Sequence, residues 1–76
     1  MSVKPIIWSG HALERMLERG FTRSEVEVTI RAPDLKENAQ RGRLRAKKRF
    51  GHRELNVFYR ETNRVIIFVT AYWRKL

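Results

Sequence analysis

A row of basic residues in the second half of the chain has the spacing needed to bind an anionic polymer. Four cations occupy alternate positions along one predicted strand: Arg43, Arg45, Lys47 and Arg49. Alternate side chains of a strand lie on one face, about 7 Å apart, close to the separation of successive phosphates in a single-stranded nucleic acid. Basic residues also protect an edge strand from aggregation, but the local charge exceeds that need. The row therefore favours contact with nucleic acid, and the neighbouring Lys48 is a further candidate.

The distribution of charge along the whole chain indicates the same class of partner. The 76 residues include 17 Lys and Arg against 8 Asp and Glu, which gives a net charge of +9. Residues 1–37 contain six basic and six acidic side chains, so the whole excess lies in residues 38–76. Such an asymmetry is typical of a protein with a polyanionic partner.

Two aromatic residues are predicted to lie near the basic row. Phe58 is expected opposite Arg45 on the neighbouring strand, and Trp73 ends the strand after that. Nucleic-acid bases stack on such rings for about 1–3 kcal/mol each. Phe58 could equally belong to the core or to a surface that a partner protein covers, and this alternative stays open. For Trp73 the binding role is favoured.

Composition excludes several other classes of site. The chain contains no Cys, which excludes disulfides, thiolate zinc sites and cysteine nucleophiles, and the distant His11 and His52 do not form a metal site by themselves. A chain of this length forms one domain, residues 1–76, too small for a deep cofactor cavity, so neither a metal nor another cofactor is expected. The longest apolar run, Val65 to Val69, is far short of a membrane span. Met1 to Pro5 lacks the apolar stretch of a signal peptide, so we expect a cytoplasmic protein without membrane contact.

Two helices are predicted in the first half, forming a hairpin over about residues 9–32. Ser9 can cap the first helix, and Gly20 can end it in the left-handed conformation. Thr22 and Glu25 fit a capping box for the second helix, which Pro33 ends. The first helix carries an apolar stripe that should face the core: Ala12, Leu13, Met16 and Leu17.

The second half, about residues 35–74, is predicted to form a sheet of three to four antiparallel strands. After a short segment at 35–38 and a turn at 39–42, the basic strand runs to Phe50. The Gly51-His52 pair fits a two-residue hairpin turn, and the next two strands, 54–60 and 65–73, meet at Thr62-Asn63. The expected fold is α+β, with the two N-terminal helices packed on one face of this sheet.

The register of the sheet decides which side chains share a face. We expect Phe50 to pair with Arg53, and Glu61 with Arg64. In this register Tyr72 points toward the helices, unless a bulge exchanges the faces of its strand. The face away from the helices would also carry three apolar residues available for a homodimer contact, Val65, Ile67 and Val69.

A motif in the first helix resembles that of a known family. It reads His11-Ala12-x-x-Arg15-Met16-x-x-Arg19-Gly20, and a Thr-capped helix, a Pro-Asp pair and a basic strand follow it. The last strand ends Thr70-Ala71-Tyr72-Trp73. From about Trp8 to Trp73, this pattern resembles the BrnT-like small domains of unknown function in the RelE/ParE toxin superfamily. The resemblance implies two helices packed on a curved antiparallel sheet, in agreement with the fold predicted from the residues.

The resemblance also implies a function. RelE-like toxins cleave mRNA, usually on the ribosome, whereas ParE-like toxins inhibit DNA gyrase. By this resemblance we expect the toxin of a type II toxin–antitoxin pair, an RNA-binding, metal-free mRNA endoribonuclease that a cognate antitoxin protein masks. Two alternatives stay open: a non-catalytic nucleic-acid-binding module and a ParE-like inhibitor of gyrase.

Roles for single residues follow from the same resemblance. A metal-free ribonuclease must deprotonate a 2′-hydroxyl, stabilise the pentavalent phosphate and protonate the departing 5′-oxygen. By resemblance, Lys47 and Arg49 hold the phosphate and orient the hydroxyl, and Arg60 on the adjacent strand clamps the anion. Tyr72 matches the location of a tyrosine that transfers protons in some RelE-like enzymes, although the predicted register turns it toward the core.

The helix motif adds two further candidates, His11 and Arg15, which stand one turn apart on the polar face of the first helix. A lone exposed histidine is usually a plain surface residue. Through their place in the motif, we expect these two residues either to contact phosphate or to pack against the edge of the sheet.

Overall fold

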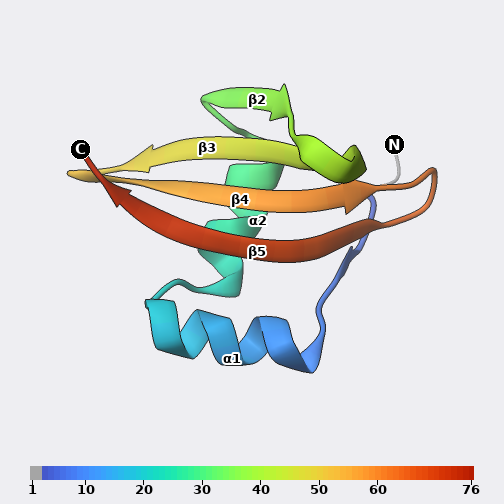
Figure 1. Ribbon diagram of the computed structural model, residues 1–76, viewed down its shortest axis with the longest axis horizontal. Helices are drawn as coiled ribbons and strands as arrows, with labels where there is room; N and C mark the ends of the chain where they lie inside the picture. The colour runs from blue at the N-terminus through green and yellow to red at the C-terminus, as the bar shows by residue number, and fades with distance from the viewer. Residues whose placement is uncertain (1–2) are drawn as a thin grey trace.

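A five-stranded sheet and two helices make up residues 3–76, the part of the chain that this computed structural model describes (Figure 1). The helices are α1 (Gly10–Arg19) and α2 (Arg23–Arg31). The strands are β1 (Ile6–Ile7), β2 (Leu35–Asn38), β3 (Leu44–Phe50), β4 (Arg53–Glu61) and β5 (Ile66–Lys75), and a 3-10 turn, η1 (Gln40–Gly42), connects β2 to β3. The strand order is β1-β5-β4-β3-β2. The predicted α+β class with two N-terminal helices is confirmed.

The helix ends follow the predicted capping residues. The Ser9 side chain accepts a hydrogen bond from the Ala12 amide at 3.1 Å, and Gly20 adopts a φ of 71° at the end of α1. Thr22 and Glu25 form the reciprocal bonds of a capping box at the start of α2. These contacts satisfy backbone donors that would otherwise lack partners, so local sequence alone sets where the helices begin and where α1 ends.

The two helices take different positions relative to the sheet. Figure 1 shows α2 behind β3 and β4, while α1 lies beside β5. Val26 and Ile30 of α2 are buried in one cluster with Leu55, Val57 and Tyr59 of β4. We call the side of the sheet that α2 covers the helix face, and the opposite side the open face.

The apolar stripe predicted for α1 is only partly covered. Ala12 and Met16 are buried, but Leu13 is exposed and Leu17 is 87% exposed. The reason is that α1 packs along β5 rather than across the sheet, so only one side of the stripe finds a partner.

The sheet has one strand that the sequence pattern did not predict. β1 pairs in parallel with β5, with Ile6 opposite Ile66 and Ile7 opposite Ile67. The expectation of a wholly antiparallel sheet of three to four strands is therefore wrong in this detail. A strand of two residues is too short to show an alternating pattern, and its pairing with β5 joins segments far apart in the chain. Local sequence therefore could not predict it.

The connection between β4 and β5 differs from the prediction. Glu61 pairs with Ile66 and not with Arg64. The Thr62 hydroxyl accepts hydrogen bonds from the amides of Arg64 at 3.2 Å and Val65 at 3.0 Å, so Thr62, rather than Asn63, organises a longer turn. This shift of two residues preserves which side chains of the first part of β5 face the core.

A bulge in β5 exchanges the faces of its second part. Tyr59 pairs with Phe68, but Phe58 pairs with Thr70, so Val69 has no partner on β4. Beyond the bulge, Tyr72 lies on the open face and Trp73 on the helix face, the reverse of the predicted register. The alternative left open for Tyr72 is thereby settled in favour of a bulge.

Two arginines of the helix motif hold this bulge in place. The guanidinium of Arg15 donates to the Thr70 hydroxyl at 3.1 Å. Arg19 donates to the same hydroxyl at 3.2 Å and to the Ala71 carbonyl at 2.9 Å. β1 pairs with β5 only at Ile66 and Ile67, so α1 supplies the partners for the edge of β5 at the bulge. We call these contacts the arginine clamp.

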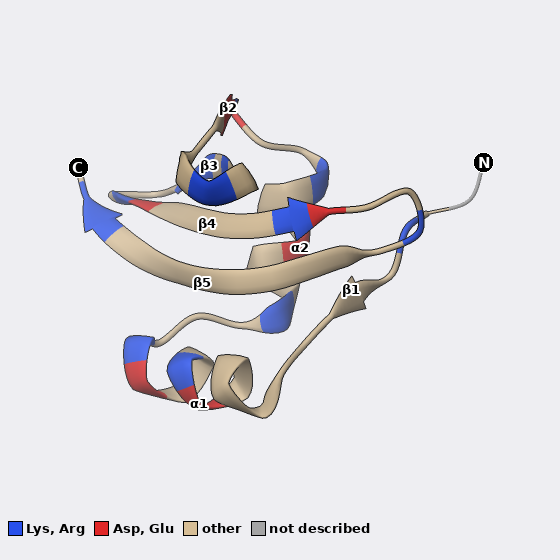
Figure 2. Cartoon of the chain, turned by 45° about the vertical axis from the view of Figure 1, so that its right-hand side comes forward, with Lys and Arg blue, Asp and Glu red and all other residues tan. Residues whose placement is uncertain are grey.

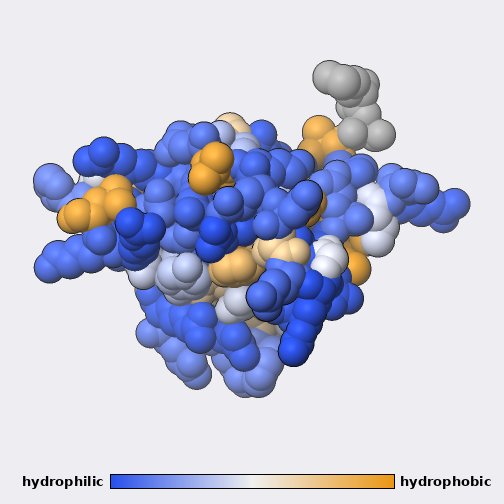
Figure 3. All heavy atoms as spheres, turned by 45° about the horizontal axis from the view of Figure 1, so that its top comes forward, coloured by the Kyte–Doolittle hydropathy of each residue, from blue (hydrophilic) through white to orange (hydrophobic). Residues whose placement is uncertain are grey.

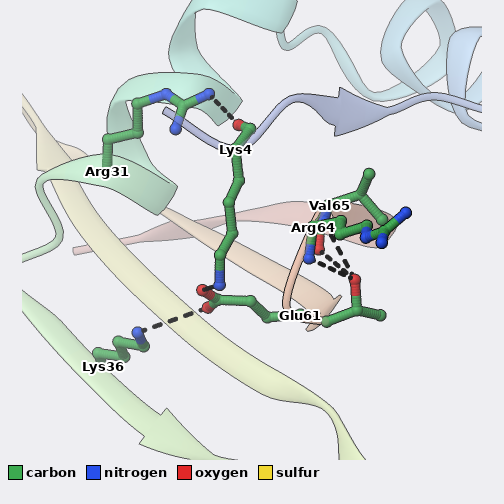
Figure 4. A network of polar contacts seen from close by, with 7 residues as sticks. Lys4, Arg31, Lys36, Glu61, Arg64 and Val65 are labelled. Carbon is green, nitrogen blue, oxygen red and sulfur yellow. Dashed lines mark hydrogen bonds and ion pairs between the residues drawn. The ribbon is translucent and has the colours of Figure 1, made fainter. Parts of the chain in front are cut away.

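An ion-pair network ties the start of the described chain to the sheet (Figure 4). Glu61 accepts a hydrogen bond from Lys4 at 2.6 Å and lies 3.9 Å from the Lys36 ammonium, while Arg31 donates to the Lys4 carbonyl at 2.9 Å. The hydrogen bond from Lys4, with a smaller contribution from Lys36, lowers the pKa of Glu61 below its ordinary value of 4.5. The network therefore joins the segment before β1 to α2, β2 and β4.

We expect Arg19→Ala to reduce the free energy of unfolding by about 1–2 kcal/mol, because Thr70 and Ala71 lose a charged hydrogen-bond donor. Urea unfolding followed by circular dichroism measures the change. Arg64→Ala is the matched control, since Arg64 is an exposed residue of the β4–β5 turn. Equal unfolding midpoints for the two variants would contradict the arginine clamp.

Acid should weaken the Glu61 network. Because the folded pKa of Glu61 lies below its unfolded value, its stabilising contribution is complete above about pH 4.5 and is lost as the pH falls through the folded value. We expect Glu61→Gln to be less stable than the wild type at pH 7, with the difference shrinking toward pH 3. Urea unfolding across this range tests the expectation, with the exposed Glu18→Gln as control. A difference that does not change with pH would show that Glu61 stabilises the fold in another way.

Candidate nucleic-acid interface on the open face

The open face carries the predicted basic row along β3. Arg45 lies opposite Phe58, Lys47 opposite Asn56 and Arg49 opposite Glu54, which confirms the predicted register of this hairpin. Phe50 pairs with Arg53 across a turn in which Gly51 has a φ of 67°. Figure 2 views β3 nearly end-on and shows basic residues in blue around this end of the strand, which Arg43 precedes.

An acidic residue from the neutral first half of the sequence lies beside this row. β2 pairs with β3 so that Glu37 is opposite Arg45. The Glu37 carboxylate accepts hydrogen bonds from the Arg45 guanidinium and lies 3.6 Å from the Lys47 ammonium. The bond from Arg45, with a smaller effect of Lys47, lowers the pKa of Glu37 below its ordinary value. Two of the row's cations are therefore partly neutralised by a neighbour 8 and 10 positions earlier in the chain.

A short aromatic stack lies next to the paired cations. The rings of Phe58 and Tyr72 are 6.1 Å apart and inclined by 23°, and the Arg45 guanidinium lies 5.8 Å from the Phe58 ring centre. Glu37, and to a smaller extent the Tyr72 hydroxyl, raises the pKa of Arg45. Tyr72 is 39% exposed, so its ring remains accessible to a ligand.

Two of the predicted catalytic residues, Lys47 and Tyr72, lie at the same level of the sheet on β3 and β5, with Asn56 of β4 between them; we call these three residues the cross-strand line. Asn56 pairs with Lys47 on one side and with Tyr72 on the other. Asn56 is only 1% exposed although it lies on the open face, and its amide donates to the Glu54 carboxylate at 3.3 Å. An asparagine in a strand gives no pattern of its own, so this residue could not be recognised from sequence. The line places Lys47, Asn56 and Tyr72 on neighbouring strands, about 5 Å apart from strand to strand.

Two residues predicted to bind RNA lie away from this face. The Trp73 indole donates to the Gly20 carbonyl at 3.0 Å, and its ring packs edge-on against Phe50 at 5.7 Å. The Lys48 ammonium donates to the Ala32 carbonyl at 2.9 Å, after the end of α2. The expected position of Trp73 is wrong because the bulge exchanges the faces. Lys48 lies on the helix face, as the alternation of side chains along β3 requires.

The other predicted residues are spread over the molecule. Arg60 is exposed on the open face, opposite Ile67, about 13 Å along β4 from Asn56. Arg49 belongs to the row, but its guanidinium donates to the Gly51 carbonyl at 3.1 Å. His11 lies on α1, whereas β5 and β4 separate α1 from β3, and its ring is 3.7 Å from the Glu14 carboxylate.

Arg15 has a structural position, since its guanidinium is engaged in the arginine clamp. This contact corresponds to the packing against the sheet edge that was one of its two expected roles. The motif therefore contributes to the open face indirectly, by fixing the bulge that exposes Tyr72.

The rest of the surface carries weaker evidence for a binding site than the open face does. Figure 3 shows mostly hydrophilic side chains with small, separate hydrophobic patches. Of the apolar residues expected to support a homodimer, Ile67 is exposed, while Val65 and Val69 are half-buried, so a homodimer stays a prediction. Within residues 3–76, no helix is long and apolar enough to span a membrane, and no three His, Asp or Glu residues lie close enough together to hold a metal ion.

Removing the acid beside the row should strengthen RNA binding. We expect Glu37→Gln to bind single-stranded RNA roughly three- to tenfold more tightly at low salt, because Arg45 and Lys47 lose their competing anion. Fluorescence anisotropy with a labelled oligonucleotide measures the change. Glu18→Gln, with the same change of charge on α1, is the control. Weaker binding by Glu37→Gln would mean that Glu37 positions the cations rather than competing for them.

Comparison with known proteins places the chain in one family. Neither the curated proteins nor the solved structures gave a match. The expected membership of the RelE/ParE superfamily therefore stays a prediction. The model of a family described as Domain of unknown function (DUF4258) matches residues 8–73. Because this match covers most of the 76 residues, the chain belongs to the DUF4258 family.

Proposed function

We propose that the open face binds single-stranded RNA and that the protein is an mRNA-cleaving toxin of the RelE type. The observation that carries this proposal is the cross-strand line of Lys47, Asn56 and Tyr72, which puts a phenol and an ammonium group on the basic face. The charge of residues 38–76 supports RNA as the partner. Such a protein would act in the cytoplasm, where an antitoxin with acidic segments would cover the open face.

Binding would combine the phosphate contacts of the row with stacking. Arg43, Arg45 and Lys47 are spaced to follow a single strand. The Arg45 guanidinium and Tyr72 already lie against the Phe58 ring, so the exposed part of Tyr72 is the surface on which a base would stack.

Cleavage would proceed without a metal. The 2′-oxygen attacks the adjacent phosphorus and loses its proton, while the bond to the 5′-oxygen breaks and that oxygen gains a proton. Lys47 and Arg45 would stabilise the charge on the phosphate, and the Tyr72 hydroxyl would take part in proton transfer. The products would be a 2′,3′-cyclic phosphate and a 5′-hydroxyl end.

One observation favours a second candidate, a nucleic-acid-binding module without catalysis. Glu37 neutralises part of the charge at Arg45 and Lys47, where the phosphate would have to be stabilised. In addition, Arg60 and His11 do not join the Lys47–Tyr72 line. A binding module would tolerate both features, whereas an enzyme needs RNA to displace Glu37.

Induction of the protein in bacteria, followed by mapping of transcript ends, tests the proposal. We expect growth arrest and new 5′-hydroxyl ends in mRNA. Tyr72→Phe should reduce cleavage by roughly 10²–10⁴-fold while RNA binding changes little, because the ring remains and only the hydroxyl is lost. Arg64→Ala is the control for an unrelated exposed residue.

The other outcomes separate the alternatives. Intact mRNA together with salt-dependent RNA binding in vitro would identify the binding module. Intact mRNA together with loss of gyrase supercoiling activity would identify a ParE-like inhibitor and contradict the proposal.

A further inference from the structure

A hollow of about 550 Å³ lies at one end of the open face, where the turn between β2 and β3 meets β4. Its volume is in the range of small-molecule sites and is sufficient for one nucleotide. The residues that line it are Asn38, Ala39, Gln40, Arg43, Arg45 and Phe58. They include two arginines, the Phe58 ring and the Gln40 carboxamide, whereas the Asn38 side chain, opposite Leu44, belongs to the helix face.

Arg43 is the lining residue whose bonding is incomplete. Its Nε atom is buried and has no hydrogen-bond partner within residues 3–76. Arg45, by contrast, already donates to Glu37. Since Nε itself is covered by protein, a ligand in the hollow would bond to the terminal nitrogens of this guanidinium.

The backbone holds Arg43 at the edge of the hollow. Its amide donates to the Gln40 carbonyl at 3.3 Å, and its carbonyl accepts from the Ala39 amide at 2.8 Å. Between them, Arg41 and Gly42 have φ angles of 62° and 71°. Arg41 is the one non-glycine residue with positive φ in the described chain, and such strained residues often occur at ligand clamps.

We propose that this hollow binds a single guanine base of the RNA on the open face, an inference that rests on the proposed function. An arginine fork matches the two acceptors, O6 and N7, on one edge of guanine. Adenine presents a donor at the corresponding position, and the pyrimidines lack this pair of acceptors. The carboxamide of Gln40 can accept from the amino and imino groups of guanine, and Phe58 offers an apolar surface to the ring.

The position of the hollow fits a base attached to RNA on the row. Arg45 belongs both to the hollow and to the row of cations on β3, and Lys47 is the next cation along the strand. A phosphate on Arg45 or Lys47 would therefore leave its nucleoside within reach of Arg43. Guanine recognition would then set the register of the RNA relative to Tyr72.

Anisotropy titrations of labelled hexanucleotides test this inference. The wild type should bind a hexanucleotide of uridines with one central guanosine at least roughly tenfold more tightly than hexauridine or the version with a central adenosine. Arg43→Lys, which keeps the charge but loses the fork, should bind all three about equally. Arg64→Lys is the matched control, and Gln40→Ala should also reduce the discrimination.

The remaining outcomes separate the inference from the function on which it rests. Equal affinity of the wild type for all three oligonucleotides would overturn guanine recognition while RNA binding stands. Failure to bind any RNA would overturn the proposed function as well. A titration with GMP shows whether the ligand is a free nucleotide or a base within RNA. If GMP binds as tightly as the guanosine-containing hexanucleotide, the ligand is a free nucleotide and the assignment to RNA is overturned.

Discussion

The arginine clamp on the β5 bulge is the interaction on which the open face depends. Arg15 and Arg19 stand one turn apart on α1 and converge on Thr70 and the Ala71 carbonyl. Without the extra residue of the bulge, Val69, which directly precedes Thr70, the alternation of β5 would turn Tyr72 into the core and Trp73 outward. A helix that contributes little to the open face directly thus determines which aromatic residue belongs to it.

On the open face, acidic side chains partly neutralise the basic ones. Glu37 and Glu54 lie among the cations of β3, so the row is less positive than its composition indicates. Glu37 accepts hydrogen bonds from Arg45, whose guanidinium also lies against the Phe58 ring, and it lowers the cost of gathering cations in the free protein. RNA phosphates would take over this role on binding, which would make binding sensitive both to salt and to the state of one carboxylate.

Local signals predicted the helices and the β3–β4 hairpin well, because their causes lie within a few residues. Ser9, Gly20 and the Thr22–Glu25 capping box satisfy backbone groups of their own turns, and Gly51 supplies the positive φ of its hairpin. Most of the errors concern contacts between distant segments; the β4–β5 turn, where Glu61 pairs with Ile66 and not with Arg64, is a local one. The pairing of β1, the approach of Glu37 to Arg45 and the bulge held from α1 all join residues that local periodicity cannot connect. The motif contained Arg15 and Arg19, but it did not indicate that they bind β5.

The most direct test of this account is a nuclear magnetic resonance titration of the labelled protein with single-stranded RNA. The account predicts that the ring signals of Tyr72 and Phe58 and the side-chain amide of Asn56 shift on binding. The indole NH of Trp73, which is bonded to the Gly20 carbonyl on the other side of the sheet, should stay unchanged. Shifts confined to Trp73 and the helices, with Tyr72 unaffected, would contradict the assignment of the open face as the RNA interface.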